Sequence, residues 1–414
     1  MSGANFLEKL LDGVEVEWKA LGDVAKYSDM RIDCTGIDEK NYVGVDNLLQ
    51  NRAGKTNSTY VPTEGRLIEY RLGDILIGNI RPYLKKIWLA NQSGGTNGDV
   101  LVVRPTHESL SSGYLHQVLT DENFFAYNMQ HAKGAKMPRG DKAKILEYEF
   151  PIPCPDNPKK SLEIQAEIVR ILDAFTELTA ELTAELIARK KQYNYYRDQL
   201  LSFEEGEVAW KTLGDVTKKW YSGGTPTAGN PEYYDGGDIP WLRTQEVKFS
   251  DIETTEVKIT QKALEKSAAK WIPANCVIIA ISGATAGRSA INKIPLTTNQ
   301  HCGCLEIDST KALYRYVFHW VSFNYENIKA LGQGARGDLN SSIIKGFALP
   351  IPYADDPEKS LAEQARIVAI LDKFDALTNS LTEGLPREIE LRQKQYAYYR
   401  DLLLSFPKPE EAEA

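Results

Sequence analysis

The sequence has few cysteines, and none of the five forms a Cys-x-x-Cys pair with another (Cys34, Cys154, Cys276, Cys302 and Cys304). We therefore expect neither a disulfide framework nor a structural zinc site. No apolar run approaches the ~20 residues needed to span a bilayer. Met1 to Leu11 include Asn5, Glu8 and Lys9, so no signal-peptide core is expected there. These absences predict a reduced, cytoplasmic protein.

An excess of positive charge is missing too. The chain of 414 residues carries 49 Lys and Arg against 57 Asp and Glu, a net charge of −8. At first sight this balance argues against a nucleic-acid partner. Its 26% charged and 42% hydrophobic residues are typical of globular proteins and exclude a disordered or collagen-like chain. The length exceeds one domain of ~100–150 residues, which predicts at least two cores.

A complete catalytic motif is also missing. Gly332–Gly337 fits Gly-x-Gly-x-x-Gly, but it follows a predicted helix and opens no βαβ unit, so no dinucleotide site is expected. Gly54-Lys55-Thr56 lacks the first glycine of a P-loop, and the five histidines show no His-x-x-x-His spacing. Asp238 with Glu246–Lys248, and Asp251 with Glu256–Lys258, loosely resemble carboxylate–lysine nuclease sites. A nuclease or methyltransferase with divergent motifs therefore stays an alternative, as does a purely protein-binding scaffold.

What the sequence does contain is a long internal repeat. Pro151-Ile152-Pro153 recurs as Pro350-Ile351-Pro352, and Tyr195-Tyr196-Arg197-Asp198 recurs as Tyr398-Tyr399-Arg400-Asp401. The first pair is 199 residues apart and the second 203, so the second copy has four extra residues, about one helical turn. A shorter block, Leu21-Gly22-Asp23-Val24, recurs at 213–216. The order is A–B–A′–B′, after an N-terminal segment 1–16: A is 17–153, B is 154–208, A′ is 209–353 and B′ is 354–414.

Segments B and B′ have the pattern of long helices. In B, apolar residues recur every three or four positions and no Gly or Pro interrupts Ser161 to Phe203, which predicts one helix of ~65 Å with Ser161 as N-cap. Such a helix needs a partner for its apolar stripe, and B′ is the natural one. In B′, Gly384 and Pro386 must kink or interrupt the helix. The tandem Thr-Ala-Glu-Leu at 179–186 is either ordinary helical patterning or a spacer adjustable in whole units.

Segments A and A′ instead contain short β-branched runs broken by Gly, Pro and Asn. We predict strands at 74–78, 100–103 and 276–281, and helices at 114–129 and 314–331. Each variable segment is therefore expected to be a mixed α/β domain with long polar loops, and the whole chain to be of the α+β class.

Basic and Gly-rich loops occur at matching places in both variable segments. Arg and Lys can bind phosphates or guanine edges, and Gly lets backbone N–H groups approach phosphate oxygens. In A these loops are 81–86 and 133–144, and in A′ they are 221–226, 282–288 and 333–337. The candidate DNA-binding residues are Arg81, Lys85, Lys86, Lys133, Lys136, Arg139, Lys142, Ser222, Gly223, Thr225, Arg243, Ser282, Thr285, Arg288, Gln333 and Arg336.

This arrangement resembles the specificity subunit of type I restriction–modification enzymes over essentially the whole chain. The resemblance is carried by two unlike domains alternating with two alike helical segments. The Thr-Ala-Glu-Leu repeat and Lys190–Phe203 are similar to the type IC subfamily. Gly223-Gly224-Thr225-Pro226 with Ile239-Pro240-Trp241 is also common in such recognition domains.

The resemblance implies that A and A′ are target recognition domains, each reading one half of a bipartite, asymmetric double-stranded DNA site. Antiparallel helices would fix their separation and, by the pseudo-two-fold order, dock two modification (methyltransferase) subunits. It implies no catalysis and no cofactor on this chain, since S-adenosylmethionine would be bound by the modification subunits and ATP and Mg²⁺ would be expected only on partner subunits, including the restriction subunits.

Overall fold

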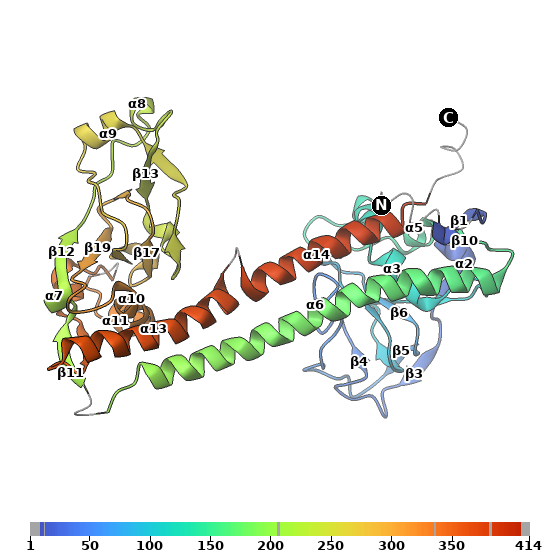
Figure 1. Ribbon diagram of the computed structural model, residues 1–414. Coiled ribbons are helices and arrows are strands. Elements are labelled where there is room, and N and C mark those ends of the chain that lie inside the picture. Colours follow the sequence, from blue (N-terminus) through green and yellow to red (C-terminus); the bar gives the residue numbers. More distant parts are fainter. Residues whose placement is uncertain (1–8, 12, 205–207, 335–336, 381–382, 407–414) are drawn as a thin grey trace. The chain divides into compact units, whose positions relative to one another are not determined.

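The computed structural model describes residues 9–11, 13–204, 208–334, 337–380 and 383–406. The chain divides into two compact units: unit 1 comprises 1–181 and 389–414, and unit 2 comprises 182–388. One helix, α6 (Pro158–Leu200), contributes its first part to unit 1 and its last part to unit 2 (Figure 1).

Unit 1 is a mixed α/β domain with short strands. Its sheets have the orders β2-β9-β6-β7 and β3-β5-β8-β4, and β1 pairs with β10 across the ends of the variable segment. Its elements before α6 are β1 (Val16–Ala20), α2 (Leu21–Val24), β2 (Ala25–Tyr27), β3 (Arg31–Asp33), β4 (Tyr42–Val43), β5 (Arg66–Tyr70), β6 (Ile75–Gly78), η1 (Pro82–Leu84), β7 (Ile87–Leu89), β8 (Gly94–Thr96), β9 (Val100–Pro105), α3 (Ser112–Leu119), α4 (Glu122–Gln130), α5 (Lys142–Leu146) and β10 (Glu149–Pro153).

The central strand β6 of unit 1 is buried on both faces. Because successive side chains of a strand point to opposite faces, Ile75 and Ile77 join one core and Leu76 joins another. The first of these cores also contains Ile164 and Ile168 of α6, so the scaffold helix is part of the domain's own core.

Unit 2 repeats this plan. Its sheets have the orders β12-β19-β16-β17-β14 and β15-β13-β18, and β11 pairs with β20, so the first four strands of the larger sheet match β2-β9-β6-β7. Its elements are β11 (Val208–Thr212), α7 (Leu213–Val216), β12 (Thr217–Tyr221), α8 (Pro231–Tyr234), β13 (Ile239–Leu242), η2 (Thr244–Glu246), β14 (Asp251–Ile252), β15 (Val257–Ile259), α9 (Gln261–Lys266), β16 (Val277–Ala280), η3 (Gly283–Thr285), β17 (Ser289–Asn292), β18 (Thr297–Thr298), β19 (Cys302–Ile307), α10 (Tyr314–Phe323), α11 (Tyr325–Ala330), α12 (Ser341–Gly346), β20 (Ala348–Pro352) and α13 (Pro357–Asn379).

A second helical segment packs beside α6 in each unit. In unit 1, α14 (Gly384–Leu403) runs antiparallel to α6, and the ring of Tyr399 stacks on Phe175 at 5.1 Å between centroids (Figure 1). In unit 2, Tyr196 of α6 stacks on Phe374 of α13 at 5.5 Å. The two stacks use repeat-related residues, so one sequence repeat builds the same helix pair twice.

The predicted interruption of B′ is confirmed. Helix α13 ends at Asn379 and α14 begins at Gly384, whose φ is +76°. A Cβ at this position would lie 2.3 Å from the carbonyl oxygen of Ala376, so only glycine fits the bend. By contrast, α6 is one continuous helix, as predicted, but it spans Pro158–Leu200 rather than Ser161 to Phe203.

Three local predictions were wrong at their boundaries. Helix α6 begins at Pro158, and Ser161 is not its N-cap; the Asn157 side chain accepts from the Lys160 N–H at 3.2 Å, while the buried Ser161 hydroxyl donates to the Ser109 carbonyl. The helices predicted at 114–129 and 314–331 are each two helices. In the first, Asp121 caps a new helix by accepting from the Asn123 N–H at 2.8 Å. In the second, α10 ends at Phe323 and Asn324 separates it from α11.

The α+β class and the strands predicted at 74–78, 100–103 and 276–281 are confirmed. Within the described ranges, no helix is both long enough and apolar enough to cross a membrane.

Candidate nucleic-acid interface

The two basic loops predicted in the first domain form one surface. The Arg81 N–H donates to the Pro138 carbonyl at 2.7 Å, and the Gly140 N–H donates to Asn79 at 3.1 Å. The second loop is closed at its base, where Lys133 and Arg139 exchange two backbone hydrogen bonds of 2.8 Å. We call residues 79–86 and 133–141 loop cluster 1.

Non-glycine residues with left-handed backbone are concentrated in and next to loop cluster 1. Of the eight non-glycine residues with positive φ in the described chain, four lie here: Asn51, Arg52, Arg81 and Lys85. They are held because the N–H groups of Asn51 and Arg52 donate to the Leu84 and Lys85 carbonyls at 2.9 Å. Left-handed non-glycine residues are costly and concentrate at functional sites, so this cluster supports a binding role. Arg52 was not among the candidates from sequence, because it belongs to no recognisable sequence pattern.

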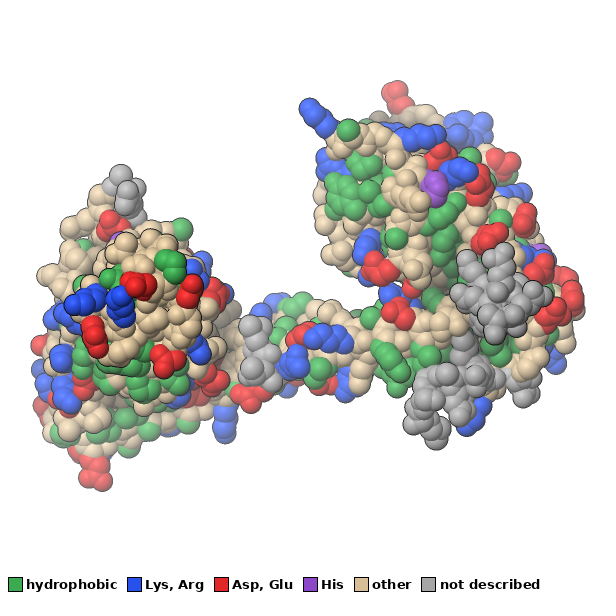
Figure 2. Space-filling view, turned by 90° about the horizontal axis from the view of Figure 1, so that it is seen from above, with side chains coloured by type: hydrophobic (Ala, Val, Ile, Leu, Met, Phe, Trp, Pro, Cys, Tyr) green, Lys and Arg blue, Asp and Glu red, His purple; other side chains and the backbone are tan. Residues whose placement is uncertain are grey.

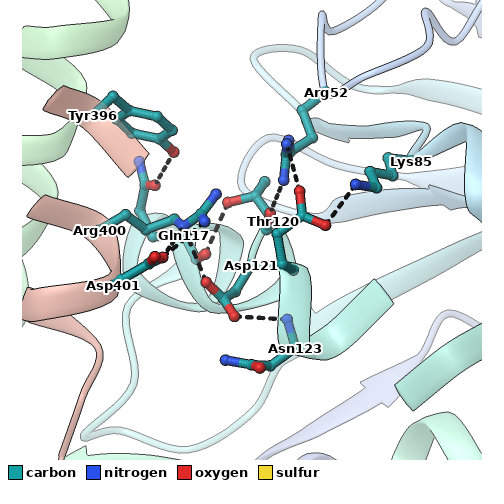
Figure 3. Close-up of polar contacts among 10 residues, drawn as sticks. Arg52, Lys85, Gln117, Thr120, Asp121, Asn123, Tyr396, Arg400 and Asp401 are labelled. Carbon is teal, nitrogen blue, oxygen red and sulfur yellow. Dashed lines mark hydrogen bonds and ion pairs between the residues drawn. The ribbon is translucent and has the colours of Figure 1, made fainter. Parts of the chain in front are cut away.

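Several cations of loop cluster 1 are tied to carboxylates. Lys85 and Arg52 share Glu122 at 2.5 and 2.9 Å, and these contacts lower the pKa of Glu122, the Lys85 hydrogen bond most (Figure 3). Lys133 contacts Asp141 at 2.6 Å and Arg139 contacts Asp99 at 3.1 Å, but both cations remain more than half exposed. The Lys86 ammonium donates to the Val45 carbonyl, whereas Arg81, Lys136 and Lys142 are exposed.

The second domain builds its loops in the same way. Gln333 and Asp338 exchange two backbone hydrogen bonds of 2.9 Å, and the Leu339 N–H donates to Ile281 at 2.8 Å. Residues 281–288, with Ser282, Thr285 and Arg288, and the described residues of 333–339 therefore form loop cluster 2. Arg336 lies outside the described residues.

One short turn in each domain joins the remaining candidate residues. In the second domain this turn is Thr298–His301. The His301 carbonyl accepts from the Ile281 N–H, and the Asn299 N–H donates to the carbonyl of Leu242, the neighbour of Arg243. The exposed Gln300 side chain accepts from the Thr225 hydroxyl at 2.7 Å. In the first domain the matching turn is Thr96–Asp99, whose Asp99 carbonyl accepts from Asn79. Sequence reasoning missed both turns, although Thr-Asn recurs at 96–97 and 298–299.

Two candidate residues of the second domain have clear structural tasks. A Cβ on Gly223 would lie 1.9 Å from the Thr298 carbonyl oxygen, so this glycine lets two backbone segments meet. Arg243 is bound by Glu256 at 2.7 Å and lies 3.6 Å from Glu246. Ser222 donates to the Gln300 carbonyl at 3.4 Å.

The two variable domains are fixed to the helices by different contacts. In unit 1, Arg400 of α14 forms a buried ion pair with Asp121 at 3.0 Å, and Tyr396 donates to Gln117 at 3.2 Å (Figure 3). In unit 2, Arg197, which is related to Arg400 by the repeat, lies over the ring of Phe323 at 5.3 Å. An ion pair in one unit is thus a cation–π contact in the other.

The described residues contain neither a metal-binding group nor an activated thiol among the buried cysteines. No group of three or more His, Cys, Asp and Glu side chains in these ranges could hold a metal ion. Burial raises the pKa of Cys276 and Cys302 to about 12, so these thiols are poor nucleophiles at neutral pH.

Acidic and basic side chains are interspersed on the face of each unit seen in Figure 2. Neither sign of charge dominates this view, so phosphate contacts would come from individual cations such as those of the loop clusters.

Comparison with known proteins gives concordant results. The family described as "Type I restriction modification DNA specificity domain" matches residues 13–190 and 206–391. The EcoR124I/EcoR124II specificity subunit of Escherichia coli is 41% identical, covering 99% of each chain. The EcoprrI specificity subunit of E. coli is 30% identical over 92% of this chain and 93% of its own length. The fold is similar to that of a type I restriction–modification S subunit from M. genitalium, with a TM-score of 0.60, 13% identity and coverage of 96% and 98%.

Proposed function

Because the chain belongs to the family of type I restriction–modification DNA specificity subunits, we propose that its two recognition domains, 17–153 and 209–353, each read one half of a bipartite, asymmetric double-stranded DNA site. One observation carries this proposal. Loop clusters 1 and 2 are built by matching backbone hydrogen bonds yet present different side chains. A common frame with unlike surfaces suits two unlike half-sites.

The helical segments, 154–208 and 354–414, would set the separation of the half-sites and dock two modification subunits. Their repeat supports this role, since Tyr195 and Tyr398, related by the repeat, are both exposed (62% and 59%). Two like surfaces fit two copies of one partner. A solved structure with a similar fold, at TM-score 0.54 and 16% identity, comes from work titled as the complex assembly of the type I restriction–modification system.

The chain itself would catalyse nothing. Three of the four carboxylates of the nuclease-like patterns are engaged elsewhere: Glu246 and Glu256 face Arg243, and Asp251 pairs with Arg315 at 3.0 Å. S-adenosylmethionine would be bound by the modification subunits, and ATP and Mg²⁺ would act on partner subunits, the restriction subunits included.

Exchange of a recognition domain tests the proposal. The methylome of cells expressing this chain with its partners gives the site, and the measurement is repeated after residues 209–353 are replaced by the matching domain of another specificity subunit. One half of the methylated site should change and the other half should stay. A site that stays whole, or methyl transfer by the purified chain alone, would contradict the proposal.

A further inference from the structure

Two large apolar side chains stand exposed on loop cluster 1. Met137 is 50% exposed and Tyr83 is 49% exposed, each one or two residues from the hydrogen bond that joins Arg81 to Pro138. We propose that Met137, together with Tyr83 of the adjoining loop, reads bases in one half of the DNA site by apolar contact. This inference rests on the proposed function and concerns how one domain performs it.

The loop presents Met137 from a fixed base. Two hydrogen bonds between Lys133 and Arg139 close a loop of only five intervening residues, and Gly134, at φ +101°, turns the chain inside it. The Arg81–Pro138 and Asn79–Gly140 hydrogen bonds then hold the loop against 79–86. Because the loop backbone is held in place, only the Met137 side chain has to be ordered on binding, which lowers the entropy cost of the contact.

The surrounding charges identify the occupant as DNA. A single exposed apolar side chain is ordinary on a protein surface and needs no partner. Here, however, Met137 lies between Lys136 and Arg139 in sequence, and both are exposed. Cations that contact phosphates beside an apolar group that contacts base surfaces are the combination that a nucleic-acid groove requires.

Loop cluster 2 offers different chemistry. The sequences 282–288 (Ser-Gly-Ala-Thr-Ala-Gly-Arg) and 333–338 (Gln-Gly-Ala-Arg-Gly-Asp) contain no aromatic residue and no aliphatic one larger than Ala, and the flanking Ile281 and Leu339 pack against the core of unit 2. Beside them the exposed Gln300 amide is held by Thr225. We therefore infer that apolar base contact belongs to the first domain, whereas polar side chains dominate in the second.

Binding of the full chain, assembled with its modification subunits, to short duplexes tests this inference. The probes are a duplex with the methylome-mapped site and two duplexes in which one half or the other is scrambled. Met137→Ala should weaken binding to the intact site about five- to tenfold. The reason is that DNA no longer buries the roughly half of the methionine side chain that is exposed in the free protein. The salt dependence should not change, since no counterion-releasing contact is lost. Tyr83→Ala should act in the same direction.

Controls separate a contact from a structural role. Met137→Leu should retain most of the affinity, and Leu72→Ala, which removes an apolar side chain that is 72% exposed in the turn between β5 and β6, should change nothing. Lys136→Ala should instead lower the salt slope by about one. The loss from Met137→Ala should vanish when one particular half is scrambled and persist when the other is.

The inference is overturned if Met137→Ala leaves specific binding unchanged, weakens specific and non-specific binding equally, or shows no dependence on either half. Failure of the proposed function looks different: the unaltered complex would then not distinguish the mapped site from either scrambled duplex.

Discussion

Asp121 serves two partners with one carboxylate. It accepts from the Asn123 N–H, which starts α4, and it pairs with Arg400, whose side chain is only 5% exposed. Asp121→Asn should keep the cap and break the ion pair, destabilising unit 1 by about 2 kcal/mol, because the buried Arg400 guanidinium loses one of two carboxylate partners and keeps Asp401 at 2.8 Å. Asp121→Ala should cost about 1 kcal/mol more, since the cap is lost as well. Urea unfolding, monitored by hydrogen exchange in α14, measures the loss of unfolding free energy for each variant.

The other unit supplies the control for Asp121. Tyr114 and Tyr316 donate to the repeat-related Pro151 and Pro350 carbonyls, and the same offset relates Asp121 to Phe323. Since Phe323 lies under Arg197, Asp121→Phe should place a ring under Arg400 and destabilise less than Asp121→Ala. Equal losses for all three substitutions would show that Asp121 matters only through local packing.

Loop cations should contribute phosphate contacts in both domains. Arg139→Ala removes a guanidinium that is 57% exposed and pairs with Asp99. Arg336→Ala removes the arginine that the sequence places in the matching loop of the second domain. Each should weaken DNA binding by the complex and lower the slope of log affinity against log salt by about one. Lys159→Ala, an exposed cation on α6, is the matched control. Affinity that is unchanged across the salt series would remove Arg139 and Arg336 from the interface.

At single positions the sequence predicted which side chains are exposed better than it predicted which groups each side chain contacts. Arg139 and Lys136 are exposed as their charge suggests, but Lys85 is bound to Glu122 and Gly223 accommodates the Thr298 carbonyl. These neighbours are 37 and 75 residues away in sequence, and only the folded chain brings them together. For the same reason Gln300 and Arg52 carried no signal, since neither belongs to a local pattern.

Among the elements, α6 is the one whose length has a direct functional consequence. Its tandem Thr-Ala-Glu-Leu at 179–186 lies in unbroken helix, and the division between the two units falls inside it. A third copy inserted after Leu186 should add ~6 Å of helix and lengthen the unread gap between half-sites by about one to two base pairs. Methylation mapping of cells expressing the insertion variant measures the gap, and an unchanged gap would exclude a spacer role. A four-residue insertion after Ser28, outside the helices, is the control.

The contact of α10 with α13 should respond to acid. Asp372 on α13 contacts Arg315 and His319 of α10 at 2.7 and 2.6 Å. Burial alone would raise the pKa of Asp372, but the hydrogen bonds from His319 and Arg315 outweigh it and lower the pKa below its usual range. A lowered folded-state pKa stabilises the fold above about pH 4, and this stability is lost as the pH falls through the folded value. Asp372→Asn should therefore destabilise unit 2 by about 1–2 kcal/mol at pH 7 and flatten its acid dependence.

Asp375, one turn further along α13, is the matched control with the opposite sign. Burial raises its pKa, so its charged form is penalised in the folded state. Asp375→Asn should leave unit 2 unchanged or more stable at pH 7. Thermal unfolding of both variants between pH 3 and 7 checks the pair, and a parallel response of the two would reject the assignment.

Elements were predictable where periodicity is long and uninterrupted. The apolar stripe of α6 and the glycine break before α14 could be read directly, because both depend on neighbours within a few residues. The breaks at Asp121 and Asn324 were missed because a polar residue inside an apolar pattern does not reveal which backbone group its side chain will bind. The sheets follow from pairings across up to 144 residues, as between Val208 and Pro352, which no local pattern specifies.

For the whole molecule, the net charge of −8 is unevenly distributed along the chain. The helical segments 154–208 and 354–414 carry net charges of −4 and −5, and residues 1–16 carry −2. The two recognition domains balance at 0 for 17–153 and +3 for 209–353. The acidic total therefore describes the scaffold and the N-terminus, and it does not exclude DNA binding by the domains.

This distribution predicts that the chain alone binds DNA weakly and that its partners complete the interface. With so little net positive charge on the recognition domains, few counterions are released, and affinity near 0.15 M salt should approach the ~10⁻⁴–10⁻⁶ M typical of non-specific binding. Assembly with the modification subunits should tighten binding to the mapped site at least a hundredfold and steepen the salt dependence, because partner cations add phosphate contacts. Fluorescence anisotropy over a salt series, for the chain alone and for the complex, measures both quantities. Equal affinity and equal slope would mean that the two recognition domains carry the whole interface themselves, and the loop cations would then have to account for all of it.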